Sequence, residues 1–545
     1  MTNIDTGLDE TTHVPQTRRR VILAAVVIVL VAALALTPPL INVDRLRHRI
    51  ATSMSQSLGR PVHLDRVSFH LLPMPGFTLE NLVVSEDPAF GYEPVIRANR
   101  VEVTLRVSSL WRRQVEISTI RFDVDEFGAG PSVNIVRNAQ GRWNLEDILV
   151  QAAHANTAPT AQRKAGPAPR FPYIEATGAR VNLKLGDEKM PFSLTDAEFA
   201  LWLPDPQEWH VRLQGQPART DTNASDTGVV RVEGTLGRAP TMGAVPISLT
   251  LDWAHAQMGE ATRLLTGDDA GWRGTVEAGA TLTGQLNSAK LTTDLHLIDL
   301  RRADFVPAKL LDISSHCIAT IDLTLTTLTQ TTCAIPSGGA VPITFTSTVF
   351  DLQHPAQAAA SLEVHEVPLA WAFDWARLFT ERIPAELAPV GTMDGTLLRS
   401  DGVWTGDLEA TMKSVTAGGR TYDFSEKPVV FDWRPVPATA VAAGSLELQL
   451  QPVAVRPGGS SQVALTGTVD SNGYTVRLSG TASPAEITTL GNDVLPPLGD
   501  ELMGSSKSAA VAGPVDIECA RPFSGVQQCV ARHVEQQPVK RRRRR

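Results

Sequence analysis

The sequence is short of the residues that metal and redox chemistry usually need. Its 545 residues include only four cysteines and twelve histidines, and none of them follows a Cys-x-x-Cys or Cys/His spacing typical of a metal site. The phosphate-binding pattern GxxxxGK[ST], the nucleophile pattern GxSxG, the zinc pattern HExxH and a glycine-rich dinucleotide fingerprint are also absent. We therefore expect no metal, no cofactor and no enzymatic activity.

Two groups of side chains come nearest to a site. Asp294 and His296 lie two residues apart, which places them on one face of a predicted strand. A solvated strand face explains this pair more simply than a metal or acid-base site. Trp371 and Trp375 lie four residues apart on a predicted helix and are interpreted as core or groove lining rather than as a cofactor site.

The overall composition and charge exclude several classes of protein. Hydrophobic residues make up 43% and charged residues 20%, while glycine and proline number 40 and 37, which argues against collagen-like, wholly disordered and polytopic membrane chains. The formal charge is −8, yet Arg18 to Arg20 and Lys540 to Arg545 supply nine positive charges, so the rest of the chain carries −17. Such an acidic body repels phosphates, and we expect no nucleic-acid partner.

One long apolar run stands near the N-terminus. Residues 21–36 carry no polar side chain, and the run continues to Ile41, enough for a helix that crosses ~30 Å of hydrocarbon at ~1.5 Å per residue. We predict a transmembrane helix over 21–41, with residues 1–20 in the cytoplasm because Arg18 to Arg20 precede the helix. A cleaved signal peptide ending near Ala35 is the alternative.

The cysteines fall into two pairs that are close in sequence. Cys317 and Cys333 flank an alternating pattern typical of a strand, so their sulfurs are expected to meet across a hairpin, and Cys519 and Cys529 form the second pair. Two disulfides would indicate an oxidising compartment. Buried free thiols are the alternative.

An amphipathic helix is predicted over residues 43–58, before the first strands. Its apolar residues are Val43, Leu46, Ile50, Met54 and Leu58. The helix has two interpretations, which are compatible: it packs on the first β-sheet, or it lies at a membrane surface with its arginines toward the headgroups. The arginines concerned are Arg45, Arg47, Arg49 and Arg60. The pattern then changes to period two, which predicts a β-module within residues 42–150.

The rest of the chain is also predicted to be mainly β. An Ala/Pro-rich linker over 151–170 leads into a body over 171–535, in which strand, short helix, Gly/Pro loop and strand recur about every 114 residues. The short helices are expected at 254–265, 368–379 and 484–490. Chance recurrence of common elements is the alternative to a repeat. The tail over 536–545 is expected to be disordered, either attracted to anionic surfaces or merely solvated.

The fold class predicted from these patterns is an extended, twisted, antiparallel β-sheet that forms a groove. About thirty strands at ~4.8 Å spacing are too many for one closed barrel. The alternation gives the sheet one apolar face, which the short helices cover only in part. The candidate groove-lining residues are Leu249, Leu251, Val476 and Leu478.

Several N-terminal motifs resemble those of the AsmA family of bacterial envelope proteins. They are the runs Gly59–Leu64, Leu71–Leu82, Ser85–Gly91, Ser109–Trp111 and Asn138–Leu145. The resemblance covers about residues 20–150 and implies an inner-membrane anchor with the bulk of the chain in the periplasm. It also implies a β-rich body similar to bridge-like lipid-transfer proteins, and a part in outer-membrane homeostasis and in the assembly and targeting of outer-membrane proteins. The implied partners are phospholipid or another acyl lipid, the inner membrane and envelope proteins. The resemblance supplies no catalytic residues.

Three functional hypotheses follow, each with a structural signature. A lipid-handling protein needs a continuous apolar sheet face that stays open. A membrane-anchored scaffold for protein partners would close that face into a dry core. An unrecognised envelope hydrolase would need converging polar side chains.

Overall fold

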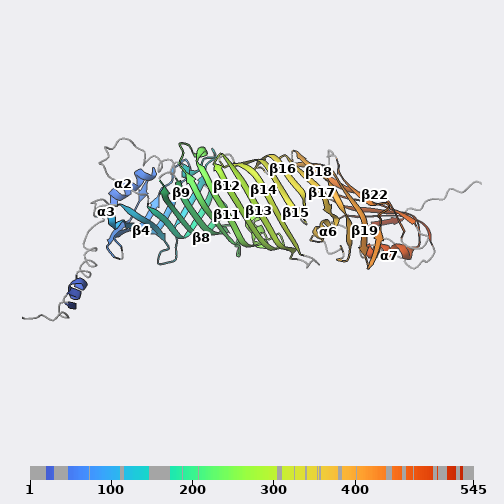
Figure 1. The fold of residues 1–545 in the computed structure, drawn as a ribbon, viewed down its shortest axis with the longest axis horizontal. Helices are drawn as coiled ribbons and strands as arrows, with labels where there is room; N and C mark the ends of the chain where they lie inside the picture. The colour runs from blue at the N-terminus through green and yellow to red at the C-terminus, as the bar shows by residue number, and fades with distance from the viewer. Residues whose placement is uncertain are drawn as a thin grey trace, which may run out of the picture. The chain divides into compact units, whose positions relative to one another are not determined.

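A computed structural model of the chain describes residues 20–531 apart from a number of gaps (Figure 1). The predicted linker over 151–170 and the tail over 536–545 lie outside the described residues, as do residues 1–19. The gaps are residue 22 and residues 30–46, 73, 111–115, 147–171, 187, 206–207, 304–309, 324–325, 338–339, 353, 355–356, 379–382, 384, 401, 437–444, 457–461, 471, 495–499, 501–511 and 523–527.

The chain is mainly β and divides into two compact units. The first comprises residues 1–216 and 235–242, and the second comprises residues 217–234 and 243–545. The linker had suggested a boundary near residue 171, whereas strands β7 (Tyr173–Leu185) and β8 (Glu188–Asp205) belong to the first unit. They do so because β7 pairs along its length with strands that precede the linker.

The first unit is built on an antiparallel group of strands, with helix α2 (Arg47–Leu58) packed against it. The group comprises β1 (Val62–His63), β2 (Arg66–His70), β3 (Gly76–Val84), β4 (Ile96–Leu105), β5 (Ile117–Asp123) and β6 (Ser132–Arg137). Ile50 and Met54 of α2 contact the core around Leu79, Leu82 and Val101. Packing on the sheet was one of the two interpretations of this helix.

Parallel pairing in the first unit corrects the expectation of a purely antiparallel sheet. The start of β7 pairs parallel with β5, and its end pairs parallel with β6. The chain between β6 and β7 is long enough for the return crossover that parallel strands need. Gly178, with a φ of 60°, marks the change of partner within β7. A Cβ at Gly130 would lie 1.8 Å from the Gly178 carbonyl oxygen, so this close approach requires glycine.

A buried polar cluster ties the loops of the first unit together. Glu86, whose side chain is 1% exposed, lies 3.8 Å from Arg60, and Arg60 also pairs with Asp87 at 2.8 Å. Asn144 donates to Glu86 and to the Asn134 carbonyl oxygen. Arg60 is therefore 5% exposed and ion-paired, and the interpretation that placed it toward lipid headgroups is wrong for this residue.

The predicted transmembrane helix falls largely outside the described residues. Residues 20–21 and 23–29 are helical, and residues 30–46 are not described. Among the described residues, no helix combines the length and the apolar character needed to cross a membrane.

The second unit is an antiparallel sheet whose strands follow one another in chain order (Figure 1). Each strand from β11 to β19 pairs with the next, and β19 then pairs with both β20 and β21. The bounds of the first nine are β11 (Pro246–Gln257), β12 (Trp272–Gln285), β13 (Ser288–Arg302), β14 (Leu311–Asp322), β15 (Thr327–Ser337), β16 (Ala340–Asp351), β17 (Ala360–Pro368), β18 (Ala388–Ser400) and β19 (Val403–Ala417).

From β21 onward the series again pairs each strand with the next, to the last described strand. Its members are β20 (Arg420–Asp423), β21 (Val429–Val436), β22 (Ser445–Val455), β23 (Gln462–Val469), β24 (Gly473–Ala482), β25 (Gly513–Pro522) and β26 (Gln528–Ala531). The chain passes between the units within two further strands, β9 (Glu208–Arg219) and β10 (Val229–Gly237).

Three short helices recur in equivalent connections. Helix α5 (Met258–Thr266) joins β11 to β12, α6 (Leu369–Arg377) joins β17 to β18, and α7 (Pro484–Val494) precedes β25 after β24; in each case the flanking strands pair with each other. Helix α5 begins at residue 258 rather than 254, because β11 continues through a bulge between Trp253 and Ala256. His255 and Glu366 adopt positive φ of 61° and 50° at the bulges just before α5 and α6.

Candidate functional site

One face of the second unit carries a continuous row of mostly apolar side chains. Residues that lie directly opposite each other in an antiparallel sheet point to the same side, so the strand registers identify the row. It crosses nine strands, or about 38 Å at ~4.8 Å per step. The row is Leu251, Ala280, Thr293, Cys317, Cys333, Phe345, Leu362, Leu397 and Gly406.

The neighbouring positions on the same face extend the apolar character. Two residues away along the strands, Leu249, Leu282, Leu291 and Ala319 form a parallel row in register. On the other side, Ala278 lies opposite Trp253 and Leu295. The face is therefore apolar in two dimensions.

The opposite face of the same strands is largely polar. The row one residue along from the first contains Asp252, Gly279, Asp294, His316, Ala334, Thr344, Glu363, Thr396 and Asp407. Because the side-chain period is two, this contrast defines one apolar and one solvated face.

A disulfide lies within the apolar row. Cys317 and Cys333 are joined, with 4.0 Å between their Cα atoms, and they are direct register partners on β14 and β15. Cys519 is also disulfide-bonded and lies opposite Cys529 in the register of β25 and β26. The first bond fixes two strands of the apolar face against each other.

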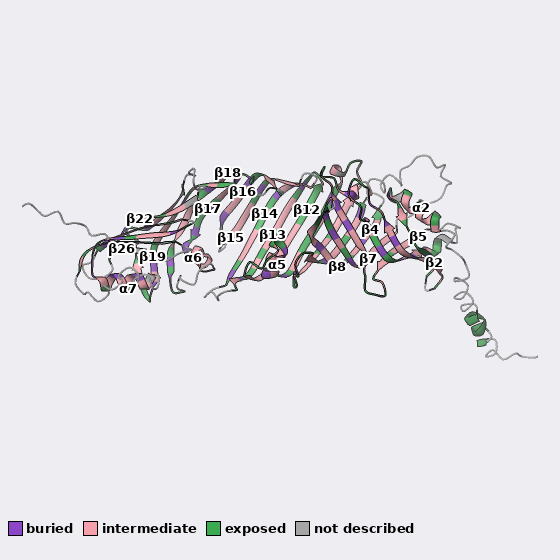
Figure 2. Ribbon diagram, turned by 180° about the vertical axis from the view of Figure 1, so that it is seen from behind, coloured by how far each residue is buried: buried purple, intermediate pink, exposed green. Residues whose placement is uncertain are grey.

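Cover over the apolar face is incomplete on the middle strands. Helix α5 contacts β11 and β12, and its Met258 packs with Val276 and Leu297. Helix α6 places Trp371 and Trp375 on the face, with ring centroids 5.8 Å apart. These tryptophans pack into the core, as one of their interpretations proposed. Away from the helices, however, the strands are mostly half-buried or exposed (Figure 2), and Leu251 is 37% exposed.

Helix α7 closes the face near the C-terminal strands. Ile487 of α7 packs into a buried cluster with Val463, Leu478, Ile517 and Cys519. Asp493 near the end of α7 accepts hydrogen bonds from the Tyr422 hydroxyl at 2.9 Å and from Arg420 at 3.1 Å, and burial raises the pKa of Tyr422. This part of the face is a packed core.

The four predicted groove residues consequently lie in two different environments. Leu249 is half-buried and Leu251 is exposed, both on β11 opposite residues of β12. Val476 is half-buried and Leu478 is buried beneath α7. Sequence reasoning missed other residues of the open face, although each belongs to an alternating segment: Leu282, Leu291, Leu295, Phe345 and Leu362.

The polar candidates do not converge on a site. Asp294 pairs with His316 of the next strand at 2.7 Å, whereas His296 lies opposite Ser314. Within the described part of the chain, no group of three or more His, Cys, Asp or Glu side chains is placed to hold a metal ion. These side chains belong to the polar face.

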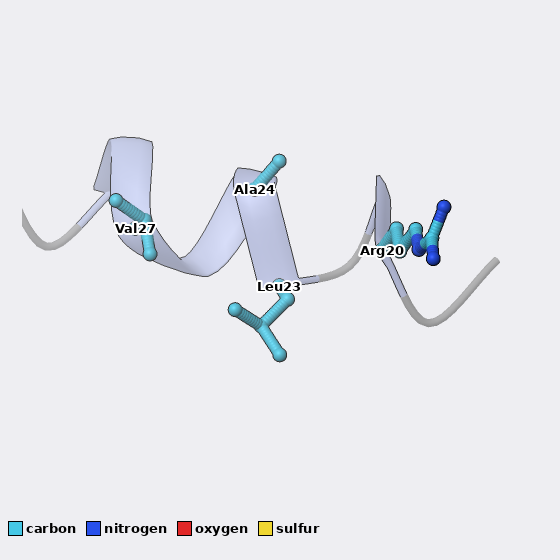
Figure 3. A pocket seen from close by; sticks show the side chains of 4 residues that line it. All are labelled: Arg20, Leu23, Ala24 and Val27. Carbon is cyan, nitrogen blue, oxygen red and sulfur yellow. The ribbon is translucent and has the colours of Figure 1, made fainter. Parts of the chain in front are cut away.

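A small hollow near the N-terminus is not a binding site either. Figure 3 shows its lining residues Arg20, Leu23, Ala24 and Val27, which all come from one short helical segment. Because their spacing of three to four residues places them on one side of that helix, the hollow is an open helix face.

Comparison with known proteins identifies the N-terminal part of the chain. The model of the AsmA family matches residues 18–174. In this region the chain is similar to the AsmA family. The match confirms the family that the N-terminal motifs had indicated and includes α2 and β1 to β6. No curated protein and no solved structure matches the chain.

Proposed function

We propose that this AsmA family protein is anchored in the inner membrane and binds or transfers phospholipid acyl chains on the apolar face of its second unit. The apolar run over 21–41 would be the anchor, with Arg18 to Arg20 in the cytoplasm and the bulk of the chain in the periplasm. In the cell, this activity would contribute to outer-membrane homeostasis and to the assembly and targeting of outer-membrane proteins.

The row of mostly apolar side chains across nine strands carries the proposal. An apolar surface of this extent is an aggregation liability unless something covers it. An acyl chain of about fifteen methylenes that buries one side on the face gains roughly half of ~0.8 kcal/mol per methylene, or about 6 kcal/mol. The sheet satisfies its own backbone hydrogen bonds, so the acyl chain needs to supply no polar group.

The test places one charge on each face of the same strand. Leu249→Glu puts a carboxylate on the open apolar face, and the matched control Thr250→Glu puts it on the exposed polar face of β11. Lipid co-purifying with the full chain is quantified by mass spectrometry. We expect Leu249→Glu to reduce bound lipid several-fold and Thr250→Glu to leave it unchanged. Equal lipid in all three proteins would contradict the proposal.

The closed cluster beneath α7 supports a second candidate, a membrane-anchored scaffold that binds envelope proteins without lipid. There the apolar face is filled by the chain's own side chains, such as Leu478 and Ile487. If this condition held for the whole unit, the wild-type chain would purify free of lipid, and hydrogen exchange on β11 to β14 would be unaffected by added phospholipid.

A further inference from the structure

Two chain connections meet at one end of the first unit. Gly76 at the start of β3 lies opposite Thr104 near the end of β4. The Leu105 amide donates to the Pro75 carbonyl oxygen at 2.8 Å, and Leu105 lies opposite Ile117 at the start of β5. The β2–β3 connection and the described ends of the β4–β5 connection therefore lie side by side.

Apolar side chains project from this end into solvent. Leu72 is 50% and Met74 54% exposed in the first connection, and Val107 is 43% and Ile117 37% exposed in the second. We call these four residues the apolar end. Single exposed apolar residues are ordinary on protein surfaces, but four on adjacent connections form a patch of the kind that marks a contact with a membrane or a partner.

Backbone carbonyl oxygens at the apolar end already accept hydrogen bonds, which lowers the cost of moving this end out of water. The Met74 carbonyl oxygen accepts a hydrogen bond from the His70 ring Nδ1 at 3.0 Å, and the Pro75 carbonyl oxygen is satisfied by Leu105. Pro75 has no N–H to desolvate. Gly76 permits this packing, since a Cβ there would lie 2.8 Å from the His70 ring. Backbone polar groups without partners are what makes loops costly in lipid, and here the Met74 and Pro75 carbonyl oxygens already accept hydrogen bonds.

The tether to the proposed anchor favours a membrane as the occupant. Five residues, 42–46, separate the apolar run over 21–41 from Arg47 at the start of α2, and they can span at most about 18 Å. Arg106 pairs with Glu116 at 3.7 Å, and the sequence of the same connection also holds Arg112 and Arg113, so basic residues accompany the apolar side chains at this end. We infer that the apolar end inserts into the interface of the membrane that holds the anchor. This inference rests on the anchor in the proposed function.

The experiment reports the environment of single positions in the full chain reconstituted into phosphatidylcholine vesicles. Val107→Cys is labelled with an environment-sensitive fluorophore, and the control is Phe127→Cys, which is 87% exposed in the turn at the other end of β5. We expect a blue shift at position 107 and quenching there by nitroxide-labelled lipid, with neither effect at position 127. The double variant Leu72→Ser/Met74→Ser should lower the inserted-to-solvated ratio at position 107 roughly tenfold, the factor for ~1.4 kcal/mol.

The outcomes separate this inference from the lipid-binding proposal. If the chain floats with the vesicles but the fluorophore at position 107 shows a solvent-exposed signal, the inference is wrong, and the apolar end is instead a surface for a protein partner. That result leaves lipid binding by the second unit intact, because co-purified lipid is measured independently. An equal signal at positions 107 and 127, or no response to Leu72→Ser/Met74→Ser, would also overturn it. Ile318→Ser/Leu398→Ser, which alters exposed apolar residues on the polar face of the second unit, serves as the matched control and should change nothing.

Discussion

Removal of the Glu86 carboxylate should destabilise the first unit strongly. The side chains of Glu86 and Arg60 are 1% and 5% exposed, so Glu86→Ala leaves the buried guanidinium with Asp87 as its remaining described ion-pair partner. Loss of one member of a buried ion pair typically costs about 3–5 kcal/mol. Because Asp87 still contacts Arg60 at 2.8 Å, we expect the lower end, about 3 kcal/mol.

Hydrogen exchange of the full chain measures this change locally. Amides of β3, β4 and β6 should exchange roughly a hundredfold faster in Glu86→Ala, the factor that corresponds to about 3 kcal/mol. The control is Glu80→Ala, which removes a carboxylate that is 45% exposed and 3.6 Å from Arg66, and it should cost less than about 1 kcal/mol. If the two variants changed exchange equally, the argument that burial makes the Glu86 cluster critical would be refuted.

Three further outcomes can be measured. Cys317→Ala/Cys333→Ala opens a loop with a sequence separation of 16 and should lower the free energy of unfolding by about 3 kcal/mol in urea titrations. Alkylation of these two cysteines in unreduced, denatured wild-type protein would contradict the disulfide. Gly130→Ala should destabilise the first unit by more than Gly186→Ala, which has open space around its Cβ and costs only the ~1 kcal/mol of a positive φ; equal urea midpoints would contradict the close approach to Gly178. Hydrogen bonds from Arg273 and the Gly271 amide lower the pKa of Asp269, so its stabilising contribution is present above the ordinary carboxyl pKa and is lost as the pH falls through the lowered pKa. The difference in urea midpoint between wild type and Asp269→Asn should therefore disappear upon acidification. A difference that stays constant with pH would contradict this.

Most of the fold could be predicted from the alternation of apolar and polar side chains. This alternation predicted the strands of both units, and the recurrence of a short helix between paired strands is present at α5, α6 and α7. The boundaries were less accurate where a bulge intervened, because a positive φ at His255 lets β11 continue beyond the point where the apolar period changes. A bulge depends on cross-strand partners that a single strand does not reveal.

Long-range pairing could not be predicted from local pattern. The parallel contact of β7 with β5 and β6 depends on a return across the linker, and nothing in the alternation of β7 specifies the direction of its neighbours. The same limit applies to the apolar face. Leu249 and Leu478 lie in equivalent alternating patterns in the sequence, but α7 buries Leu478 and does not cover Leu249.

The serial pairing of strands in the second unit makes its size adjustable. From β11 to β19 each strand pairs with the next along the chain, so a new hairpin can enter at a turn without rethreading any other strand. An insertion must add strands in twos, since a single strand would reverse the direction of everything that follows. Proteins with this strand order can therefore evolve sheets of different length by duplication of hairpins, and each added hairpin lengthens the apolar surface by about 10 Å.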